Sequence, residues 1–311
     1  MKVSESHGGM CKLLLATDLS PASEQLIDFT RNLKVLNIEQ ILLTFCLNIS
    51  DNGIMKDAME VKIPTLEKQA ARLTHAGFQV KTEIRFGMPA VEILNAAEEK
   101  KCQLLVIGSH GRNLSDRISL GGTASALLHN LTLPGMVVKI PSIAAYEKQH
   151  TSLLDHVLYV TDFSENADTA FTCLEKLTAR GARKITLLHI QDHIIGKHLK
   201  DRLEIFNRID LERLKCLARR MQSLGKPEIK MEIPYGGVAE LILKQINHDN
   251  VSLVVMGAQG RGYIGKPFLG GVTNKVLRSS PVPLLVVPFV SGLQWSSAAR
   301  ECSMIDELNL K

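Results

Sequence analysis

The stretch that decides the fold begins at Gly257 and reads Gly-Ala-Gln-Gly-Arg-Gly-Tyr-Ile-Gly-Lys-Pro-Phe-Leu-Gly-Gly-Val-Thr, ending at Thr273. An apolar run, residues 253–256, leads into it, and residues 272–277 continue from it with helical spacing. A buried strand, a glycine-rich loop and a helix start, in that order, leave backbone N–H groups unpaired at the helix N-terminus. The partial positive charge of that terminus favours an anion there. The stretch therefore predicts an anion cradle after a strand.

The same order of features occurs earlier, at residues 108–140, so the chain is a duplication. Four glycines repeat without gaps, since Gly87, Gly108, Gly111 and Gly121 align with Gly236, Gly257, Gly260 and Gly270. We expect a first domain over residues 1–141, a linker over 142–153, a second domain over 154–288 and a C-terminal tail over 289–311.

Apolar runs and amphipathic stretches alternate along each half. Strands are predicted at residues 12–17, 40–48, 78–86, 103–107 and 136–140, and the second half repeats the order from residues 156–161 onward. This alternation predicts an α/β fold made of two tandem open parallel five-stranded sheets, with helices on both faces. Ligands of such sheets bind at the carboxyl ends of the strands. Asp18 and Asp162 each follow such an end, as do Gly108 and Gly257.

Local signals place several helix boundaries. Ser20 followed by Pro21 predicts an N-cap with proline in the first turn. Pro64 is expected near the start of its helix, because proline is poorly tolerated in a helix interior. The helix over residues 201–224 is expected to bury one apolar face made of Leu203, Phe206, Leu214, Leu217 and Leu224.

The composition excludes several classes of protein. The chain has 311 residues, a net charge of +5 and no block of Lys or Arg, which does not indicate nucleic-acid binding. No apolar run reaches membrane-spanning length, and no secretory signal opens the chain. The six cysteines are scattered without a CxxC pair, so we expect buried thiols in a reducing cytoplasm.

With these motifs in place, the chain resembles the universal stress protein family in its tandem form. The family's motif, Gly-x2-Gly-x9-Gly followed by Ser or Thr, has its glycine spacing met at Gly108, Gly111 and Gly121, and again at Gly257, Gly260 and Gly270. The early Thr-Asp pair occurs twice, as Thr17-Asp18 and Thr161-Asp162. The pattern Pro-x-x-Val-Val ends the second half at residues 283–287.

The resemblance implies an adenine nucleotide alpha hydrolase-like, Rossmann-like fold and a cytoplasmic stress-response regulator that binds ATP, with or without Mg²⁺, or a related adenine nucleotide. In the second half it implies nucleotide contacts from Thr161, Asp162, Ile190, Gly257, Gln259, Gly260, Gly270, Gly271, Val272 and Thr273. In the first half it implies them from Thr17, Asp18, Gly108, His110, Gly111, Gly121, Gly122 and Thr123. It also implies regulatory protein partners and fifth strands that pair between halves as a pseudodimer, or between chains as a homodimer.

The motif departs from the family in the same way twice. Gly122 and Gly271 stand where the family has Ser or Thr, so a hydroxyl that can bind a phosphate oxygen is missing. Such a bond to a charged group contributes roughly 1.5–3 kcal/mol. Thr273 lies close enough in sequence to compensate, whereas the first half has Ala124 there. The sequence thus favours the second half as the nucleotide site.

Other interpretations stay open beside this one. Asp18 and Asp162 can bind a nucleotide or can simply cap the following helices. The chain can also be a nucleotide-free scaffold that works through protein contacts. A Walker A reading fails because Pro267 replaces the magnesium-binding Ser or Thr, and a dinucleotide site fails because no acidic residue ends the next strand. No catalytic grouping is visible, so we expect no enzyme, with slow ATP hydrolysis through Asp18 or Asp162 as the weakest reading.

Overall fold

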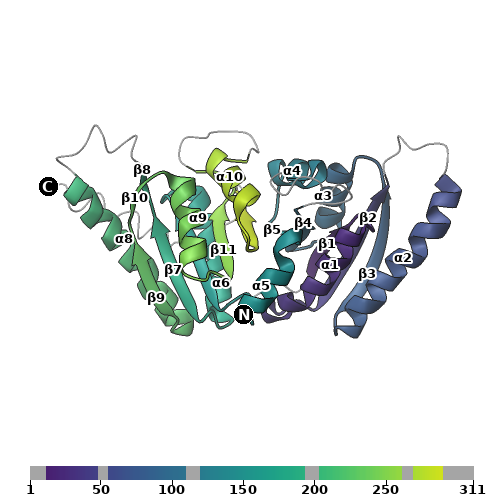
Figure 1. Ribbon diagram of the computed structural model, residues 1–311, viewed down its shortest axis with the longest axis horizontal. Helices are drawn as coiled ribbons and strands as arrows, with labels where there is room; N and C mark the ends of the chain where they lie inside the picture. The colour runs from purple at the N-terminus through teal and green to yellow at the C-terminus, as the bar shows by residue number, and fades with distance from the viewer. Residues whose placement is uncertain (1–11, 48–54, 110–119, 193–202, 261–268, 290–311) are drawn as a thin grey trace, which may run out of the picture. The chain divides into compact units, whose positions relative to one another are not determined.

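The computed structural model describes residues 12–47, 55–109, 120–192, 203–260 and 269–289. The chain divides into two compact units, Met1–Ala144 and Ala145–Lys311. In each unit a parallel sheet carries helices on both faces (Figure 1). The predicted α/β class with tandem parallel sheets is confirmed.

The first unit alternates strands and helices throughout. Its elements are β1 (Lys12–Thr17), α1 (Pro21–Phe29), η1 (Thr30–Leu36), β2 (Gln40–Leu47), α2 (Met55–His75), β3 (Gln79–Phe86), α3 (Pro89–Glu99), β4 (Leu104–Gly108), α4 (Gly122–His129) and β5 (Gly135–Val138). The strand order is β3-β2-β1-β4-β5, and every pairing is parallel. Helices α1 and α2 pack together, and α3 packs with α4.

The second unit repeats this arrangement. Its elements are β6 (His156–Thr161), α6 (Glu165–Ala179), β7 (Lys184–His189), β8 (Gln191–Asp192), α8 (Leu203–Gly225), β9 (Glu228–Glu232), β10 (Tyr235–Gly236), α9 (Val238–His248), β11 (Leu253–Gly257), α10 (Gly271–Ser279) and β12 (Leu284–Val287). The strand order is β12-β11-β6-β7-β9, again parallel. The short β8 and β10 form a separate two-stranded sheet, which the sequence did not signal.

The central strands form the core because their apolar runs are continuous. Leu13, Leu14 and Leu15 of β1 are fully buried, which requires cover on both faces of the sheet. In β11, Leu253, Val254 and Val255 are likewise fully buried. The outer strand β3 is largely half-buried or exposed, as an edge strand can be.

The predicted start of the first helix is confirmed. Ser20 is the N-cap of α1, and its side chain accepts a hydrogen bond from the Ser23 N–H at 3.3 Å, with Pro21 in the first turn. Ser164 caps α6 in the same way, through the Ala167 N–H at 3.3 Å. The two halves therefore begin their first helices with the same device.

Three local expectations are wrong. Pro64 lies inside α2, which begins at Met55; Pro64 is exposed, so water can bind the carbonyl that loses its donor. Of the predicted apolar face of α8, Leu214 and Leu217 are buried, whereas Phe206 and Leu224, toward the two ends of the helix, are each 39% exposed. The Leu203 side chain lies outside the described residues. Cys216 is disulfide-bonded, whereas Cys46, Cys102 and Cys173 are free thiols; sequence spacing does not report which cysteines meet in space.

The segment expected as a loosely patterned linker is structured. A short η3 (Ile140–Ser142) leads into α5 (Ile143–Gln149), and the boundary between the two compact units falls within α5. Tyr146 and His150 are buried there with ring centroids 4.7 Å apart. None of the helices in the described part of the chain has the length and apolar character of a membrane span.

Candidate functional site

Each sheet reverses its strand order beside its first strand. β1 lies between β2 and β4, and β6 lies between β7 and β11. The chain leaves β1 toward one face and β4 toward the other, which opens a crevice at the carboxyl ends of the strands. Asp18 follows β1 and Gly108 ends the neighbouring β4, and Asp162 and Gly257 stand in the same way at β6 and β11, so the expected neighbours are confirmed.

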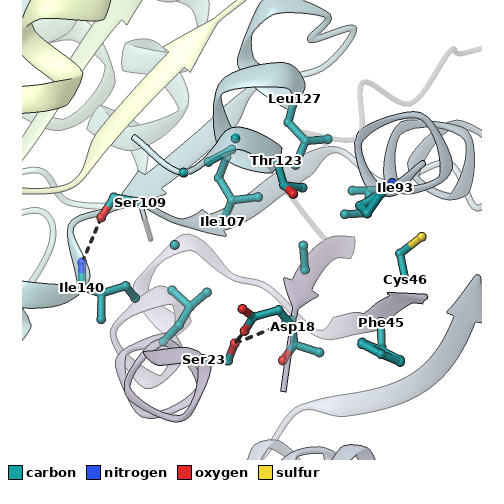
Figure 2. Close-up of a pocket in the computed structure, with 18 of the residues that line it drawn as sticks. Asp18, Ser23, Phe45, Cys46, Ile93, Ile107, Ser109, Thr123, Leu127 and Ile140 are labelled. Carbon is teal, nitrogen blue, oxygen red and sulfur yellow. Dashed lines mark hydrogen bonds between the residues drawn. The ribbon is translucent and has the colours of Figure 1, made fainter. Parts of the chain in front are cut away.

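The crevice of the first half contains a cavity of about 360 Å³. Its lining comes from the ends of β1, β2 and β4 and from the starts of α3 and α4 (Figure 2). All six residues predicted for this half that lie in the described chain line it, namely Thr17, Asp18, Gly108, Gly121, Gly122 and Thr123. His110 and Gly111, also predicted, lie outside the described residues.

A tight turn after β1 holds Asp18 at the cavity. Leu19, the next residue, has φ 59°, a left-handed conformation that is uncommon for a bulky side chain. Asp18 Oδ1 accepts hydrogen bonds from the Ser20 N–H at 3.1 Å and from the Ser23 hydroxyl. The Thr17 hydroxyl accepts the Leu19 N–H at 3.1 Å and donates to Gln69 Oε1 at 2.8 Å. One oxygen of Asp18 thus stabilises the turn before α1, whereas Ser20 caps the helix, and Asp18 also lines the cavity.

Opposite Asp18, helix α4 begins with its first turn open to the cavity. The Gly121 N–H bonds Ser109 O at 2.9 Å, which fixes the loop, and no side chain caps the helix. Figure 2 shows Thr123 above the cavity and Asp18 below it. A Cβ added at Gly122 would have no atom within 4 Å. The unpaired N–H groups of this turn and the positive end of the helix therefore face open space, where an anion can bind.

The remaining wall is apolar. Phe45 and Cys46 from β2 and Ile93 from α3 lie along one side of the cavity (Figure 2). Lys62 of α2 lies over the Phe45 ring, with its Nζ 5.0 Å from the ring centroid. Burial, with a smaller contribution from Glu92, raises the pKa of the Cys46 thiol to about 11, so the thiol stays protonated and unreactive. The sequence did not single out these residues, although strand ends at a crevice are where such residues lie.

In the second half, several of the predicted residues bond one another within the protein. The Thr273 hydroxyl, expected to reach a phosphate, donates instead to Gly257 O at 3.1 Å and is buried. The Gly270 N–H bonds Ala258 O at 2.8 Å, as its counterpart does in the first half. A Cβ at Gly260 would lie 2.8 Å from Asp162 Oδ2, so that carboxylate reaches across the crevice to the loop.

The other residues predicted for this half lie after β6, β7 and β11 and at the start of α10. Asp162 Oδ1 accepts the Ser164 N–H at 3.0 Å and the Ser164 hydroxyl at 2.5 Å. Ile190 is buried directly after β7, and Val272 is 38% exposed on the first turn of α10. Gln259 is half-buried, and a Cβ at Gly271, like one at Gly122, would meet no atom within 4 Å.

A buried polar network occupies the second half where the first half has its apolar wall. Thr161 pairs in register with His189, as Thr17 pairs with Phe45. His189 Nδ1 lies 2.9 Å from Thr161 O, and its Nε2 lies 3.3 Å from Asp210 Oδ2. The His189 ring packs on Phe163, with centroids 4.6 Å apart, and the Arg213 guanidinium lies over the same Phe163 ring at 5.1 Å.

Asp210 is the centre of that network. Gln191 donates to Asp210 Oδ2 at 3.1 Å, and Arg213 lies 3.5 Å from Asp210 Oδ1. Burial alone would raise the pKa of Asp210, but the hydrogen bond and charge of His189, the Gln191 bond and the charge of Arg213 together lower it. Asp210 is therefore held as a carboxylate. Sequence inspection missed this network because its members are scattered over three elements.

No group of three or more metal-ligating side chains is assembled within the described ranges. Asp18 and Asp162 follow the strands next to β4 and β11, and each uses one oxygen to accept hydrogen bonds within its own turn. A magnesium ion would therefore have to take most of its ligands from water and from a bound phosphate, as Mg²⁺ usually does in nucleotide sites.

The fold and the site define a tandem α/β protein with a glycine-rich loop at the switch point of each sheet. A model of the universal stress protein family matches residues 10–139 and 154–288, so the chain belongs to the universal stress protein family, with two family domains in tandem.

The relatives agree with this assignment. A universal stress protein of Mycolicibacterium smegmatis is 28% identical over 221 residues, covering 69% of this chain and 70% of its own. Universal stress protein Rv2005c of Mycobacterium tuberculosis is 28% identical over 217 residues, with 67% and 68% covered. The crystal structure of a universal stress protein from Archaeoglobus fulgidus superposes with a TM-score of 0.68 at 24% identity, covering 91% of this chain and 97% of that one.

Proposed function

We propose that this protein is a stress-response regulator of the cytoplasm that binds ATP, with or without Mg²⁺, or a related adenine nucleotide in the first-half cavity. The observation that carries the proposal is that the cavity combines apolar lining residues with an uncapped helix N-terminus. The apolar side chains of Phe45, Ile93 and Ile107 line the cavity and can contact a purine, and the open first turn of α4 can bind a phosphate.

The volume and the polar groups support the same ligand class. A cavity of about 360 Å³ falls in the range of small-molecule sites. Asp18 Oδ2 has no role in the turn that Oδ1 forms, so that oxygen can accept a hydrogen bond from a ribose hydroxyl or an exocyclic amine. Lys62, at the cavity edge, adds a positive charge that complements phosphate.

The preference of the sequence for the second half rested on the Thr273 hydroxyl. That proton is donated to Gly257 O, so a phosphate could receive it only if this buried bond broke. The cavity described above favours the first half instead. Regulatory protein partners, and pairing of the fifth strands within the chain or between chains, are predictions of the same proposal.

Calorimetric titration of the purified full chain with ATP, with and without Mg²⁺, tests the proposal. Mass spectrometry of the denatured protein would detect nucleotide carried through purification. We expect saturable heat with ATP, and weaker binding in an Asp18→Asn variant, which keeps the size of the side chain and removes its charge. No carried-over nucleotide and no heat at millimolar ATP would contradict nucleotide binding and favour a nucleotide-free scaffold.

A further inference from the structure

We infer that the chain binds one nucleotide rather than two, because in the second half a buried polar and charged network stands where the first half has its apolar wall. The inference rests on the proposed function and adds to it which half is used. It identifies His189, Asp210 and Arg213 as the residues that determine this difference.

The wall residues of the two halves are equivalent by register and by helix position. Phe45 and His189 are the β2 and β7 partners of Thr17 and Thr161. Lys62 and Asp210 lie on the long helices α2 and α8, the same distance before Gly77 and Gly225, and each contacts the equivalent strand residue. Where the first half has the Phe45 ring beneath Lys62, the second half has the His189 imidazole bonded to the Asp210 carboxylate.

This exchange replaces apolar surface with a polar, charged network. Phe45 is 1% exposed and His189 is 6% exposed, so the two positions are equally buried and differ in chemistry. The Asp210 and Arg213 side chains, 10% and 16% exposed, add a carboxylate and a guanidinium beside His189. Their contacts link the loop after β6, strand β7 and helix α8 through Phe163. A base would meet polar and charged groups here instead of an apolar surface. Displacing them would leave the Asp210 carboxylate without its partners, which is strongly unfavourable.

The charge around the second crevice also opposes a polyphosphate. Asp162, Glu165 and Asp168 gather where β6 meets α6. Burial, followed by the charges of Asp162 and Glu165 and offset in part by Arg213, raises the pKa of Asp168 to about 6. In the first half, Pro21 stands where Glu165 does. Glu24, the counterpart of Asp168, is neutralised by Arg72 and accepts a hydrogen bond from Gln69 at 2.7 Å.

Two matched substitutions test the inference. Gly122 and Gly271 are the first residues of α4 and α10, and neither has an atom within 4 Å of an added Cβ or a backbone that excludes a side chain. A glutamate at either position is compatible with the fold, because a negative charge stabilises a helix N-terminus. In the first half it would also compete with a phosphate for the same N–H groups.

We expect the full-length wild type to bind one ATP per chain by calorimetry. Gly122→Glu should weaken binding at least about tenfold, whereas Gly271→Glu should leave affinity and stoichiometry unchanged. Gly122→Gln, of equal size but neutral, should weaken binding less than Gly122→Glu. Circular dichroism and urea unfolding would verify that all three variants fold.

The outcomes separate this inference from the proposed function. Two ATP per chain, or weaker binding in Gly271→Glu, would overturn the inference and leave nucleotide binding intact. One ATP per chain with Gly122→Glu unaffected would also overturn it. No heat with the wild type would overturn the proposed function itself.

Discussion

The two halves share a backbone but differ in the side chains that line its crevice. Both place a left-handed residue after the aspartate, Leu19 with φ 59° and Phe163 with φ 58°, and both cap the next helix with serine. In the first half the ends of β1, β2 and β4 surround a cavity, and in the second an ion-pair network links the equivalent residues. The comparison teaches that a duplicated backbone preserves the place of a site without preserving its chemistry.

The largest expected effect comes from breaking the network. Asp210→Ala leaves His189 and Arg213 without their carboxylate, and we expect the second unit to lose about 3–5 kcal/mol of stability. The matched change Lys62→Ala removes a cation over the Phe45 ring and should cost the first unit only about 0.5–1 kcal/mol. Urea unfolding, fitted with separate transitions for the two units, measures both. Equal losses would show that the network does not stabilise the second half.

The next largest effect is expected from restoring the hydroxyl that the first half lacks at Gly122. Gly122→Ser puts a hydroxyl at the start of α4, where an added side chain meets nothing. A new bond to a phosphate oxygen, worth about 1.5–3 kcal/mol, should tighten ATP binding by about tenfold or more. Gly271→Ser is the control, since the second half is not expected to respond. A gain of affinity in the control instead would reverse the assignment of the two halves.

A smaller effect distinguishes the two helix caps. Ser164→Ala removes both the cap of α6 and a hydrogen bond to Asp162, and should cost about 1 kcal/mol. Ser20→Ala should cost less, because the Ser23 hydroxyl still holds Asp18 in the first half. Thermal unfolding of both variants compares them. A larger loss for Ser20→Ala would contradict this ranking.

The smallest expected effect is the dependence of stability on pH. Burial lowers the pKa of His150 and of His156, both in the second unit, so folding favours their neutral forms. Their contribution is present above the unfolded pKa of about 6.5 and is lost as pH falls through the lower folded pKa. Asp168 acts in the opposite sense, since its pKa is raised to about 6 and its contribution is lost as pH rises through that value.

We therefore expect urea midpoints of the second unit to fall modestly from pH 7 toward pH 5. His156→Gln should flatten that dependence, and Asp168→Asn should steepen it. An unchanged slope in His156→Gln would remove His156 as its source.

Much of the fold could be predicted from the sequence. Strands β1, β6 and β7 begin and end where their apolar runs do, and the N-cap at Ser20 follows from local chemistry alone. The helix through Pro64 could not be predicted, because exposure of one carbonyl to water decides whether an interior proline is tolerated. The disulfide at Cys216 likewise depends on which segments meet in space.

By itself, the sequence determined where each crevice lies, because glycine spacing and strand order are local and repeated. Only the tertiary structure decided what each crevice contains. Phe45 and Lys62, like His189, Asp210 and Arg213, are far apart in sequence, and they meet only when a long helix packs against its sheet. Whether a duplicated loop faces a cavity or a network depends on those long-range contacts, which the spacing of its glycines does not encode.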